Sequence, residues 1–512
     1  MKKPSFCDAE IVGEDSLSAD APKPKVEIRV DPKILTLSPI VEADSAIAIG
    51  NGNGNGSDNK ESDGRTRVMF CGTYPIGQSN GYSRVVYYIS KLLGLKDDFA
   101  LTVYGFQNFN QTAGSDSRKD IPSTVKLHDA LSTEHPRRNG FGEKEVATFL
   151  KQNPQDIVII FNDMVVTSML VQTIVNELSP VQRKKFKLVS YMDQVYPYQK
   201  KEFINMLNTH FDAVIAFTPY WRQTVRTLGL EPRIPCYVFP HGFDHTIYYP
   251  MPRHLARRYF DIPENAFTVL NLNRNQPRKR WDHTIMAFAI VIARYHDLVL
   301  AYENKDNKDN KDNKDNKNNK KHKQLTKPLP VRLVVGTSMD SCWVLMDVLE
   351  HELKLLRVPW EFGKECVIPV PNSQLLSDRD INILYNSCDI GLNTCEGEGF
   401  GLCQIEHMAV GSPQVVQRIG GMQEFLNSDN STLVESKIRC YIDKTRDSIG
   451  GIAELGDPKD FADAMWKYYT DRKLLDKHAK AGRVHILQHY RWSVMVDHFH
   501  TILGNIRDTM IS

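Results

Sequence analysis

The chain has 512 residues, of which 41% are hydrophobic and 25% charged. This length and composition are ordinary for a globular protein of two or three domains. The 64 basic and 62 acidic residues leave a net charge of +2, which excludes the large basic excess normally found in nucleic-acid binders. The nine cysteines include no CxxC pair. They therefore predict reduced thiols and a cytoplasmic location, without a disulfide framework or a zinc site.

Two segments have a composition that predicts no packed core. Residues 1–64 are poor in aromatic residues and contain the run Asn51–Gly56, so we expect a disordered leader. The leader turns acidic before any apolar run, which argues against a secretory signal. A repeat of Lys, Asp and Asn at Lys305–Lys323 predicts a solvated, low-complexity loop insertion over 303–326. The longest apolar stretch, around Met164–Val175, is too short to span a bilayer.

Apolar strands alternate with amphipathic helices in the first half of the chain. We expect four buried strands there, at Arg67–Gly72, Asp156–Phe161, Lys187–Met192 and Asp212–Phe217. A loop that contains glycine, Thr73–Ser83, follows the first strand and leads into a helix. This alternation is typical of a parallel sheet that is covered by helices on both faces.

A break rich in Pro, Gly and aromatic residues follows at Phe239–Pro252. Four more buried strands are expected after it, at Thr268–Asn273, Val331–Gly336, Cys366–Val370 and Asp389–Thr394. We therefore predict an α/β protein with two Rossmann-like, doubly wound domains, 65–248 and 249–490, facing each other across a cleft. In open parallel sheets the ligand lies at the carboxyl ends of the strands.

The most informative stretch is Glu396–Glu406, EGEGFGLCQIE, which contains an E-x7-E motif formed by Glu398 and Glu406. A predicted strand, Ser387–Thr394, precedes it, and a predicted helix start, Gln404–Ala409, ends it. Glycines let backbone amides approach a ligand closely, and a helix N-terminus favours negative charge. The pattern suits a sugar nucleotide, with amides for its phosphates and carboxylates for its hydroxyls. The alternative is a glycine-rich turn with two solvated acids.

A pair of cations follows the first strand of the second half. Arg274 closes that strand and Lys279 comes five residues later, within Asn273–Trp281. Arg offers a forked donor and Lys a mobile point charge, and together they suit a diphosphate whose charge grows as it leaves. The alternative is a merely basic loop.

In their order along the chain, these motifs resemble the family 4 retaining glycosyltransferases (glycosyl transferases group 1), which have the two-domain GT-B fold. The most specific elements are the Glu398–Glu406 motif, the Arg274 and Lys279 pair, and His241–Asp244 at the interdomain crossing. Residues 491–512 also look like the closing helix of this family, which packs back on the N-terminal domain.

The resemblance implies transfer of a sugar from a nucleotide-diphosphate sugar to an acceptor hydroxyl, with retention of configuration. Glu398 would bind hydroxyls of the donor sugar and Glu406 the ribose. Arg274 and Lys279 would stabilise the departing diphosphate, so neither a metal nor another cofactor is implied. The C-terminal domain would hold most of the donor, and the N-terminal domain an unidentified glycan, lipid or protein acceptor.

The resemblance also implies contacts made by the backbone. Near the diphosphate they are expected from Gly399, Phe400, Gly401 and Leu402. Gly77 and Gly81, in the loop after the first strand, would let the backbone of the N-terminal domain approach the diphosphate or the acceptor.

One departure from the family concerns the acceptor side. Family members often carry His-Asp after the strand that here ends at Met192, so this chain keeps only Asp193. Asp193 could still orient groups or handle a proton, as could Asn162 or Asp163 at the preceding strand end. For each of the three, an ordinary capping role at the strand end is the alternative. A dedicated base is not required, since the donor phosphate can itself accept the proton of the acceptor.

Two other functions compete with glycosyl transfer: a sugar-nucleotide epimerase, and a non-catalytic scaffold that binds a nucleotide sugar. The E-x7-E pattern argues against the epimerase, and Met192 favours the scaffold. A peripheral membrane contact through the basic cluster Arg183, Lys184, Lys185 and Lys187 is also conceivable. A charged, solvated turn explains this cluster more simply.

Overall fold

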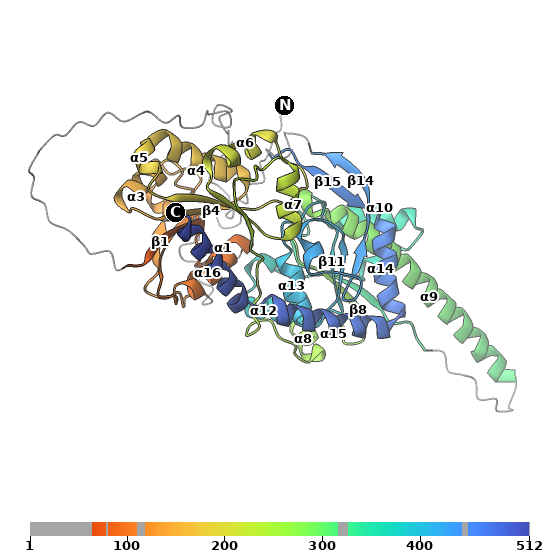
Figure 1. Cartoon of the computed structure of the whole chain (residues 1–512). Helices are drawn as coiled ribbons and strands as arrows, with labels where there is room; N and C mark the ends of the chain where they lie inside the picture. The colour runs from red at the N-terminus through yellow and green to blue at the C-terminus, as the bar shows by residue number, and fades with distance from the viewer. Residues whose placement is uncertain (1–63, 78–79, 110–117, 316–325, 443–448, 511–512) are drawn as a thin grey trace, which may run out of the picture. The chain divides into compact units, whose positions relative to one another are not determined.

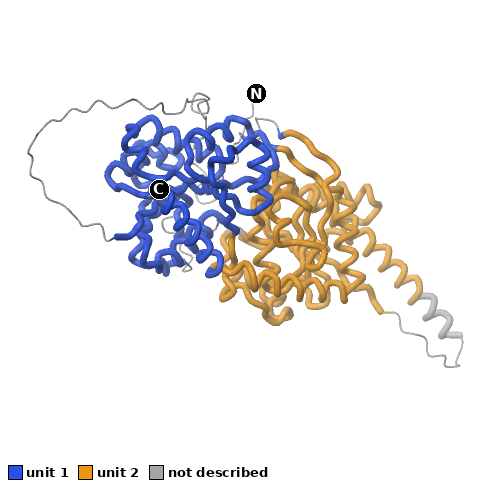
Figure 2. The backbone as a smooth tube through the Cα atoms, viewed as in Figure 1, with its two compact units in different colours: residues 1–240, 442–451, 493–512 blue, residues 241–441, 452–492 orange. Residues whose placement is uncertain are grey.

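The computed structural model describes residues 64–77, 80–109, 118–315, 326–442 and 449–510 (Figure 1). The predicted leader lies outside the described residues, apart from Gly64. The chain divides into two compact units (Figure 2). Unit 1 takes the chain up to residue 240 together with 442–451 and 493–512, and unit 2 takes 241–441 and 452–492. The boundary predicted at 248/249 comes slightly later in the chain than this division.

Unit 1 is built on a parallel sheet with the strand order β3-β2-β1-β4-β5-β6-β7. Its strands are β1 (Thr66–Thr73), β2 (Phe99–Phe106), β3 (Lys126–Asp129), β4 (Ile157–Asn162), β5 (Lys187–Met192), β6 (Ala213–Ala216) and β7 (Cys236–Val238). Its helices are α1 (Gly81–Leu93), α2 (Ala130–Thr133), α3 (Val146–Gln152), α4 (Met164–Glu177), α5 (Pro180–Arg183), α6 (Lys201–His210), α7 (Pro219–Thr227) and α16 (Trp492–Asp508). Every residue of β4 is buried, as expected for a strand covered on both faces.

Unit 2 has a second parallel sheet, with the order β10-β9-β8-β11-β12-β13. Its strands are β8 (Phe267–Asn271), β9 (Val331–Val335), β10 (Val367–Pro369), β11 (Ile390–Asn393), β12 (Gln414–Gln417) and β13 (Thr432–Val434), with a separate antiparallel pair of β14 (Ser436–Tyr441) and β15 (Ile452–Gly456). Its α-helices are α8 (Arg253–Tyr259), α9 (Trp281–Asp315), α10 (Leu345–Leu355), α11 (Trp360–Lys364), α12 (Asp378–Ser387), α13 (Leu402–Ala409), α14 (Pro458–Thr470) and α15 (Arg472–His489). Short 3-10 helices are η2 (Pro277–Lys279), η3 (Ser373–Leu375) and η4 (Gly420–Glu424).

The predicted fold class, two α/β domains with parallel sheets, is confirmed. Each of the eight predicted strands overlaps a strand of these sheets. Strands β2, β3, β7, β12 and β13 were not predicted from the sequence. Four of these five have only three or four residues, and such short strands carry little periodic pattern.

Helix α16 belongs to unit 1, although it follows unit 2 in the chain. The ring of Phe499 stacks on Phe239 with a centroid distance of 4.5 Å and lies edge-on to Phe70 at 6.2 Å. At the surface, Lys96 pairs with Asp497 at 2.7 Å. The aromatic core of unit 1 is therefore completed by a helix from the far end of the sequence.

Ile442 and Ile449–Gly451, the described residues of the segment between β14 and β15, also belong to unit 1, although both strands belong to unit 2. The amide of Lys200 donates to the carbonyl of Ile449 at 3.1 Å, and Ile449 packs against the core of unit 1. A Cβ on Gly451 would lie 2.5 Å from the ring of Tyr196, so the backbone passes close to this aromatic side chain.

Helix α9 continues into the low-complexity repeat. The sequence predicted a loop insertion over 303–326, but the helix runs to Asp315 and projects beyond the other elements of unit 2 (Figure 1). Residues 316–325 lie outside the described residues. Once a helix is nucleated, each added residue contributes a further hydrogen bond, so the buried first part of α9 supports this extension. Among the described residues, this is the one helix long and apolar enough to cross a membrane by length and composition. Ile285, Phe288 and Ile292 bury it in the core of unit 2.

Candidate active site

The candidate site of unit 2 lies where two neighbouring parallel strands end. Strand β8 pairs with β11, with Val269 opposite Ile390. Because parallel strands end at the same edge of a sheet, the loop 272–280 after β8 lies beside the loop 394–401 after β11. A backbone hydrogen bond joins the loops, from the amide of Glu396 to the carbonyl of Arg278 at 3.0 Å.

Lys279 and Glu398 form an ion pair between these loops. The ammonium donates to Glu398 Oε2 at 2.7 Å, and the side chains are 13% and 12% exposed. Arg278 donates to the carbonyl of Gly397 at 2.8 Å and lies 3.8 Å from the same Glu398 oxygen. Burial acts to raise the pKa of Glu398, but the charges of Lys279 and Arg278 outweigh it and lower this pKa overall. Glu398 is therefore ionised at neutral pH, directly beside a predicted cation.

The glycine-rich turn between β11 and α13 is tightly packed. Gly401 precedes α13 with a left-handed φ of 98°, a conformation that glycine adopts without a steric penalty. A Cβ on Gly421 would lie 2.0 Å from the carbonyl oxygen of Gly399, so these two backbone segments touch. Leu402 is the first residue of α13, and the amides of such a helix start point away from the helix.

Phe400 is buried by aromatic neighbours of unit 2. It is 2% exposed, and its ring lies 5.0 Å from His241 and 5.3 Å from Phe425 between centroids. Burial lowers the pKa of His241 to about 3, so its imidazole is neutral. The side chain of Phe400 thus serves packing, and the predicted ligand contact there would come from the backbone.

Glu406 lies in a buried polar cluster on α13. It is 1% exposed, and the hydroxyl of Tyr385 donates to its Oε2 at 3.0 Å. The ring of Tyr385 stacks on His407 with a centroid distance of 4.9 Å. Glu406, which was predicted to bind a ribose, thus already accepts a hydrogen bond from Tyr385. Tyr385 was missed in the sequence because nothing local to it points to Glu406.

Arg274 lies in the loop after β8 and is half-buried. The indole N–H of Trp281 donates to the carbonyls of Arg274 at 3.1 Å and Asn273 at 3.2 Å. Trp281 is fully buried. The loop that carries both predicted cations is thereby anchored in the core of unit 2.

Asn162 is the last residue of β4, and Asp193 directly follows the neighbouring strand β5 of unit 1. The amide of Asp193 donates to the carbonyl of Asn162 at 3.1 Å. The hydroxyl of Tyr82, in the first turn of α1, donates to a carboxylate oxygen of Asp193. The ends of β4 and β5 and the start of α1 therefore meet, and Met192 beside them is 1% exposed.

Asp163 caps helix α4. Its Oδ1 accepts from the amides of Val165 and Val166, both at 2.9 Å. Of the roles that the sequence left open for Asp163, the contacts show the capping role. Its own amide donates to the side chain of Asn162 at 2.9 Å.

The two predicted glycines of unit 1 lie on either side of residues 78–79, which are not described. Gly77 has a left-handed φ of 74°. Gly81 is the first residue of α1, and the side chain of Asn80 caps this helix by accepting from the amide of Ser83 at 2.8 Å. A helix of 13 residues thus begins at the carboxyl end of β1.

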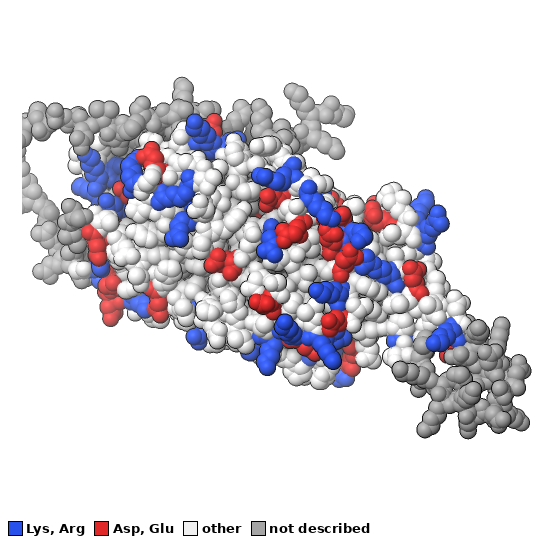
Figure 3. Space-filling view, turned by 45° about the vertical axis from the view of Figure 1, so that its right-hand side comes forward, with Lys and Arg blue, Asp and Glu red and all other residues white. Residues whose placement is uncertain are grey.

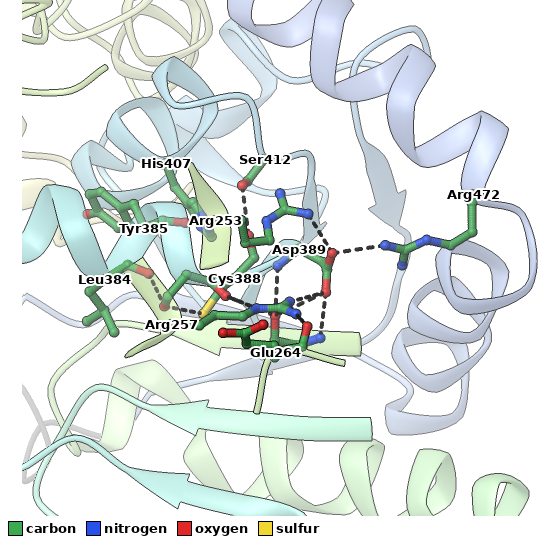
Figure 4. A network of polar contacts seen from close by, with 12 residues as sticks. Arg253, Arg257, Glu264, Leu384, Tyr385, Cys388, Asp389, His407, Ser412 and Arg472 are labelled. Carbon is green, nitrogen blue, oxygen red and sulfur yellow. Dashed lines mark hydrogen bonds and ion pairs between the residues drawn. The ribbon is translucent and has the colours of Figure 1, made fainter. Parts of the chain in front are cut away.

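A second ionic cluster, which was not predicted from the sequence, lies at the other end of the unit 2 sheet. Asp389 immediately precedes β11 and is 2% exposed on its side chain. Arg253, Arg257 and Arg472 lie 2.7, 3.0 and 3.0 Å from its carboxylate (Figure 4). The amide of Thr268, near the start of β8, donates to the same carboxylate at 2.8 Å. This cluster ties α8 and α15 to the sheet, away from the strand ends that carry the candidate site.

The charged side chains of the surface are mixed in sign. Figure 3 shows Lys and Arg interspersed with Asp and Glu over the face in view, in keeping with the net charge of +2. Among the residues that the structure describes, no three His, Cys, Asp or Glu side chains gather where they could hold a metal ion. That the reaction needs no metal stays a prediction.

Part of the chain matches the model of a known protein family. Residues 364–471, which include Glu398 and Glu406, match the family model of Glycosyl transferases group 1. The chain is 23% identical over 298 residues to a D-inositol 3-phosphate glycosyltransferase of Thermobifida fusca (strain YX), covering 56% of this chain and 53% of the relative. A protein of the same name from Geodermatophilus obscurus is 24% identical over 263 residues, covering 51% and 45%. The chain thus spans about half the length of the curated relatives it matches.

The structure of the chain is similar to solved structures of other proteins. Sucrose-phosphate synthase from Thermosynechococcus elongatus has a TM-score of 0.60 at 13% identity, covering 87% of this chain and 100% of that one. Anabaena HepE, solved in complex with UDP-glucose, has a TM-score of 0.58 at 14% identity, covering 86% and 100%. The chain has the GT-B fold. The family model and both curated relatives carry the names of glycosyltransferases.

Proposed function

We propose that the protein is a family 4 retaining glycosyltransferase, which moves a sugar from a nucleotide-diphosphate sugar to an acceptor hydroxyl without a metal ion. The GT-B fold and the match of residues 364–471 to Glycosyl transferases group 1 support this proposal. The single observation that carries it is the Lys279–Glu398 pair at the carboxyl ends of β8 and β11, beside the glycine-rich start of α13.

The pair gives each partner a distinct task. An ammonium has three donors, and one of those on Lys279 is directed at Glu398, so the group can also meet an anionic oxygen. Glu398 is kept ionised by its cationic neighbours and is an acceptor for hydroxyls of the donor sugar. Arg274, in the same loop as Lys279, would supply a second charge. Amides at the start of α13 would face the diphosphate.

The reaction breaks the bond between the anomeric carbon and the phosphate oxygen, and the nucleoside diphosphate leaves with the electron pair. The acceptor oxygen bonds to the anomeric carbon on the same face, and its proton passes to an oxygen of the leaving phosphate. Lys279 would stabilise the negative charge as it grows on this oxygen. Such a contact is stronger in the transition state than in the ground state, which is the condition for raising kcat.

The neighbours suggest the first substrates to test. HepE was solved with UDP-glucose, so UDP-glucose is the first donor, followed by ADP-glucose, GDP-mannose and UDP-N-acetylglucosamine. The curated relatives are named for D-inositol 3-phosphate, which leads the acceptor panel. Donors are screened by thermal shift, because a ligand that binds the native state raises the melting temperature by mass action.

Turnover is then measured as nucleotide release with each acceptor. Lys279→Ala and Glu398→Ala are expected to abolish it while the melting temperature stays that of a folded protein. Lys459→Ala is the matched control, because Lys459 forms an exposed ion pair with Asp463 at 2.8 Å in the same unit. The anomeric configuration of the product is read by NMR, and the rate is compared with and without EDTA.

Each outcome has a definite meaning. Full activity in Lys279→Ala or Glu398→Ala would refute the assignment of these residues to the active site. A product with inverted anomeric configuration, or loss of activity in EDTA, would refute the proposed retaining, metal-independent mechanism. A nucleotide sugar that is bound but never transferred would favour the scaffold function instead. The buried Met192 is the observation that motivates this second candidate. Isomerisation of the donor without an acceptor would identify an epimerase.

A further inference from the structure

Lys279 is the middle member of three consecutive cations that are joined to the loop after β11. On one side of it, Arg278 donates to the carbonyl of Gly397 at 2.8 Å. On the other side, Arg280 Nη1 lies 3.5 Å from Glu396 Oε2. Both neighbours of Lys279 therefore contact the same segment that carries Glu398.

The backbone of Arg280 is held in an unusual conformation. Its φ of 48° and ψ of 54° are left-handed, which costs a residue with a Cβ about 1–2 kcal/mol. The hydroxyl of Thr394 donates to the carbonyl of Arg280 at 2.9 Å and lies 2.7 Å from the hydroxyl of Thr284. Such conformations persist where surrounding contacts fix them, and they cluster at functional sites.

The side chain of Arg280 is fixed from two directions. Its Nε and Nη2 donate to the two oxygens of Asp282 at 2.9 and 2.6 Å, which is the bidentate geometry that only a guanidinium provides. Its Nη1 faces Glu396, whose side chain is 0% exposed. The amide of Glu396 also donates to the carbonyl of Arg278 at 3.0 Å. Glu396 therefore contacts the residues on both sides of Lys279.

From this geometry we propose that Arg280 is a positioning residue, which acts through Glu396 and Asp282 to hold the Lys279 ammonium against Glu398. The inference rests on the proposed function, since Lys279 matters to catalysis only if a diphosphate leaves there. Without the guanidinium, the buried carboxylate of Glu396 would have lost the cation that faces it. The turn at residues 278–280 would also have lost the contacts of Arg280 with Glu396 and Asp282, next to Lys279. The effect should appear in kcat more than in donor affinity. A displaced ammonium would mainly lose its stabilisation of the negative charge that grows on the leaving phosphate in the transition state.

The decisive variant is Arg280→Gly, which removes the side chain but keeps a residue suited to the left-handed conformation. Arg357→Gly is the matched control, because Arg357 is an exposed arginine of the same unit with a left-handed φ of 58°. We expect Arg280→Gly to lower kcat about 10–100-fold, as for a group misplaced by about 1 Å. The KM for the donor should change little, and Arg357→Gly should match the wild type. Arg280→Lys should remain impaired because it cannot bind Asp282 in a bidentate manner.

Two readouts separate positioning from a general loss of structure. Added guanidinium chloride at millimolar concentration should partly restore Arg280→Gly but not Lys279→Ala. The pKa of the Glu398 carboxyl, followed by carbon NMR of labelled glutamate and assigned with Glu398→Gln, should rise in Arg280→Gly, since it is lowered in the wild type by its cationic neighbours.

The two proposals fail in distinguishable ways. If the wild type turns over but Arg280→Gly has the same kcat, or if the Glu398 titration is unchanged in Arg280→Gly, the positioning role is wrong. If the wild type neither binds nor transfers any nucleotide sugar, the proposed function is wrong. The Glu398 titration then still decides whether Arg280 sets the position of Lys279.

Discussion

The cluster around Asp389 gives a prediction whose size follows from the structure. Asp389→Asn keeps the shape of the side chain but removes its charge and replaces one acceptor oxygen by an NH2 group. In the wild type Arg253 and Arg472 contact one oxygen, at 2.7 and 3.0 Å, and Arg257 contacts the other at 3.0 Å. An asparagine turned either way would therefore direct its NH2 group at a guanidinium.

The loss is large because the cluster is buried. The side chain of Arg257 is 5% exposed and that of Asp389 is 2% exposed, so solvent cannot replace the missing carboxylate. Removal of one partner from a buried ion pair costs about 3–5 kcal/mol. For a domain of the size of unit 2, this corresponds to a fall in the melting temperature of about 6–20 °C. Such a loss is a large part of a typical total stability of about 5–15 kcal/mol.

The assay is urea denaturation of the full chain, with unfolding monitored by tryptophan fluorescence. Asp463→Asn is the control, because Asp463 also pairs with two cations, Arg294 and Lys459, but is 45% exposed. Exposed pairs contribute about 0–1 kcal/mol, so this variant should differ little from the wild type. Equal unfolding free energies for Asp389→Asn and Asp463→Asn would refute the reasoning.

The comparison of the wild type with Asp389→Asn also predicts a pH dependence of the stability. Burial acts to raise the pKa of Asp389, but Arg253, Arg472 and Arg257 outweigh it and lower this pKa overall. A carboxyl with a lowered pKa stabilises the fold above its unfolded pKa of about 3.9, and this stabilisation is lost as the pH falls through the folded value. The difference in unfolding free energy between wild type and Asp389→Asn should thus be constant above about pH 5 and shrink below about pH 4. A difference that grows on acidification would contradict this assignment.

Three further predictions concern local contacts, all measured by urea denaturation. Asp163→Ala should cost about 1 kcal/mol by removing the cap of α4, and Asp163→Asn, which keeps an acceptor, should cost less. Gly401→Ala should destabilise by at least about 1 kcal/mol, because its φ is 98° and the new Cβ would lie 2.8 Å from Met422 Cγ. Tyr385→Phe should cost about 1–3 kcal/mol, since Glu406 would lose a buried donor. Neutral results would show that these contacts do not stabilise the fold.

The strands that were predicted correctly are those that parallel packing makes easy to recognise. A strand buried on both faces reads as a continuous apolar run, as in Asp156–Phe161, where β4 is buried throughout. The extension of α9 to Asp315 was not predicted, because Lys, Asp and Asn in a short repeat have a composition typical of solvated loops. Attachment to a buried helix overrode that composition.

The candidate site was predictable where short-range spacing is informative. Glu398 and Lys279 were selected from motifs next to strand ends, and the structure brings them together at 2.7 Å. Other contacts join residues from different elements, such as the hydrogen bond from Tyr385 to Glu406 and the ion pairs of the arginines with Asp389. No local sequence pattern predicts such pairs. Arg280 and Glu396 were present in the same motifs, but only the backbone angles and the distances show why they matter.

The interleaving of the units has a consequence for biosynthesis. The ribosome releases β1 to β7 first, yet Phe499 cannot reach Phe239 and Phe70 until α16 has emerged, after all of unit 2. Domains generally fold as they leave the ribosome, beginning with the N-terminal one. Here unit 1, whose strands are made first, can complete its core only after the whole of unit 2 has been synthesised. Nascent chains stalled before residue 493 should therefore expose these aromatic rings and attract chaperones.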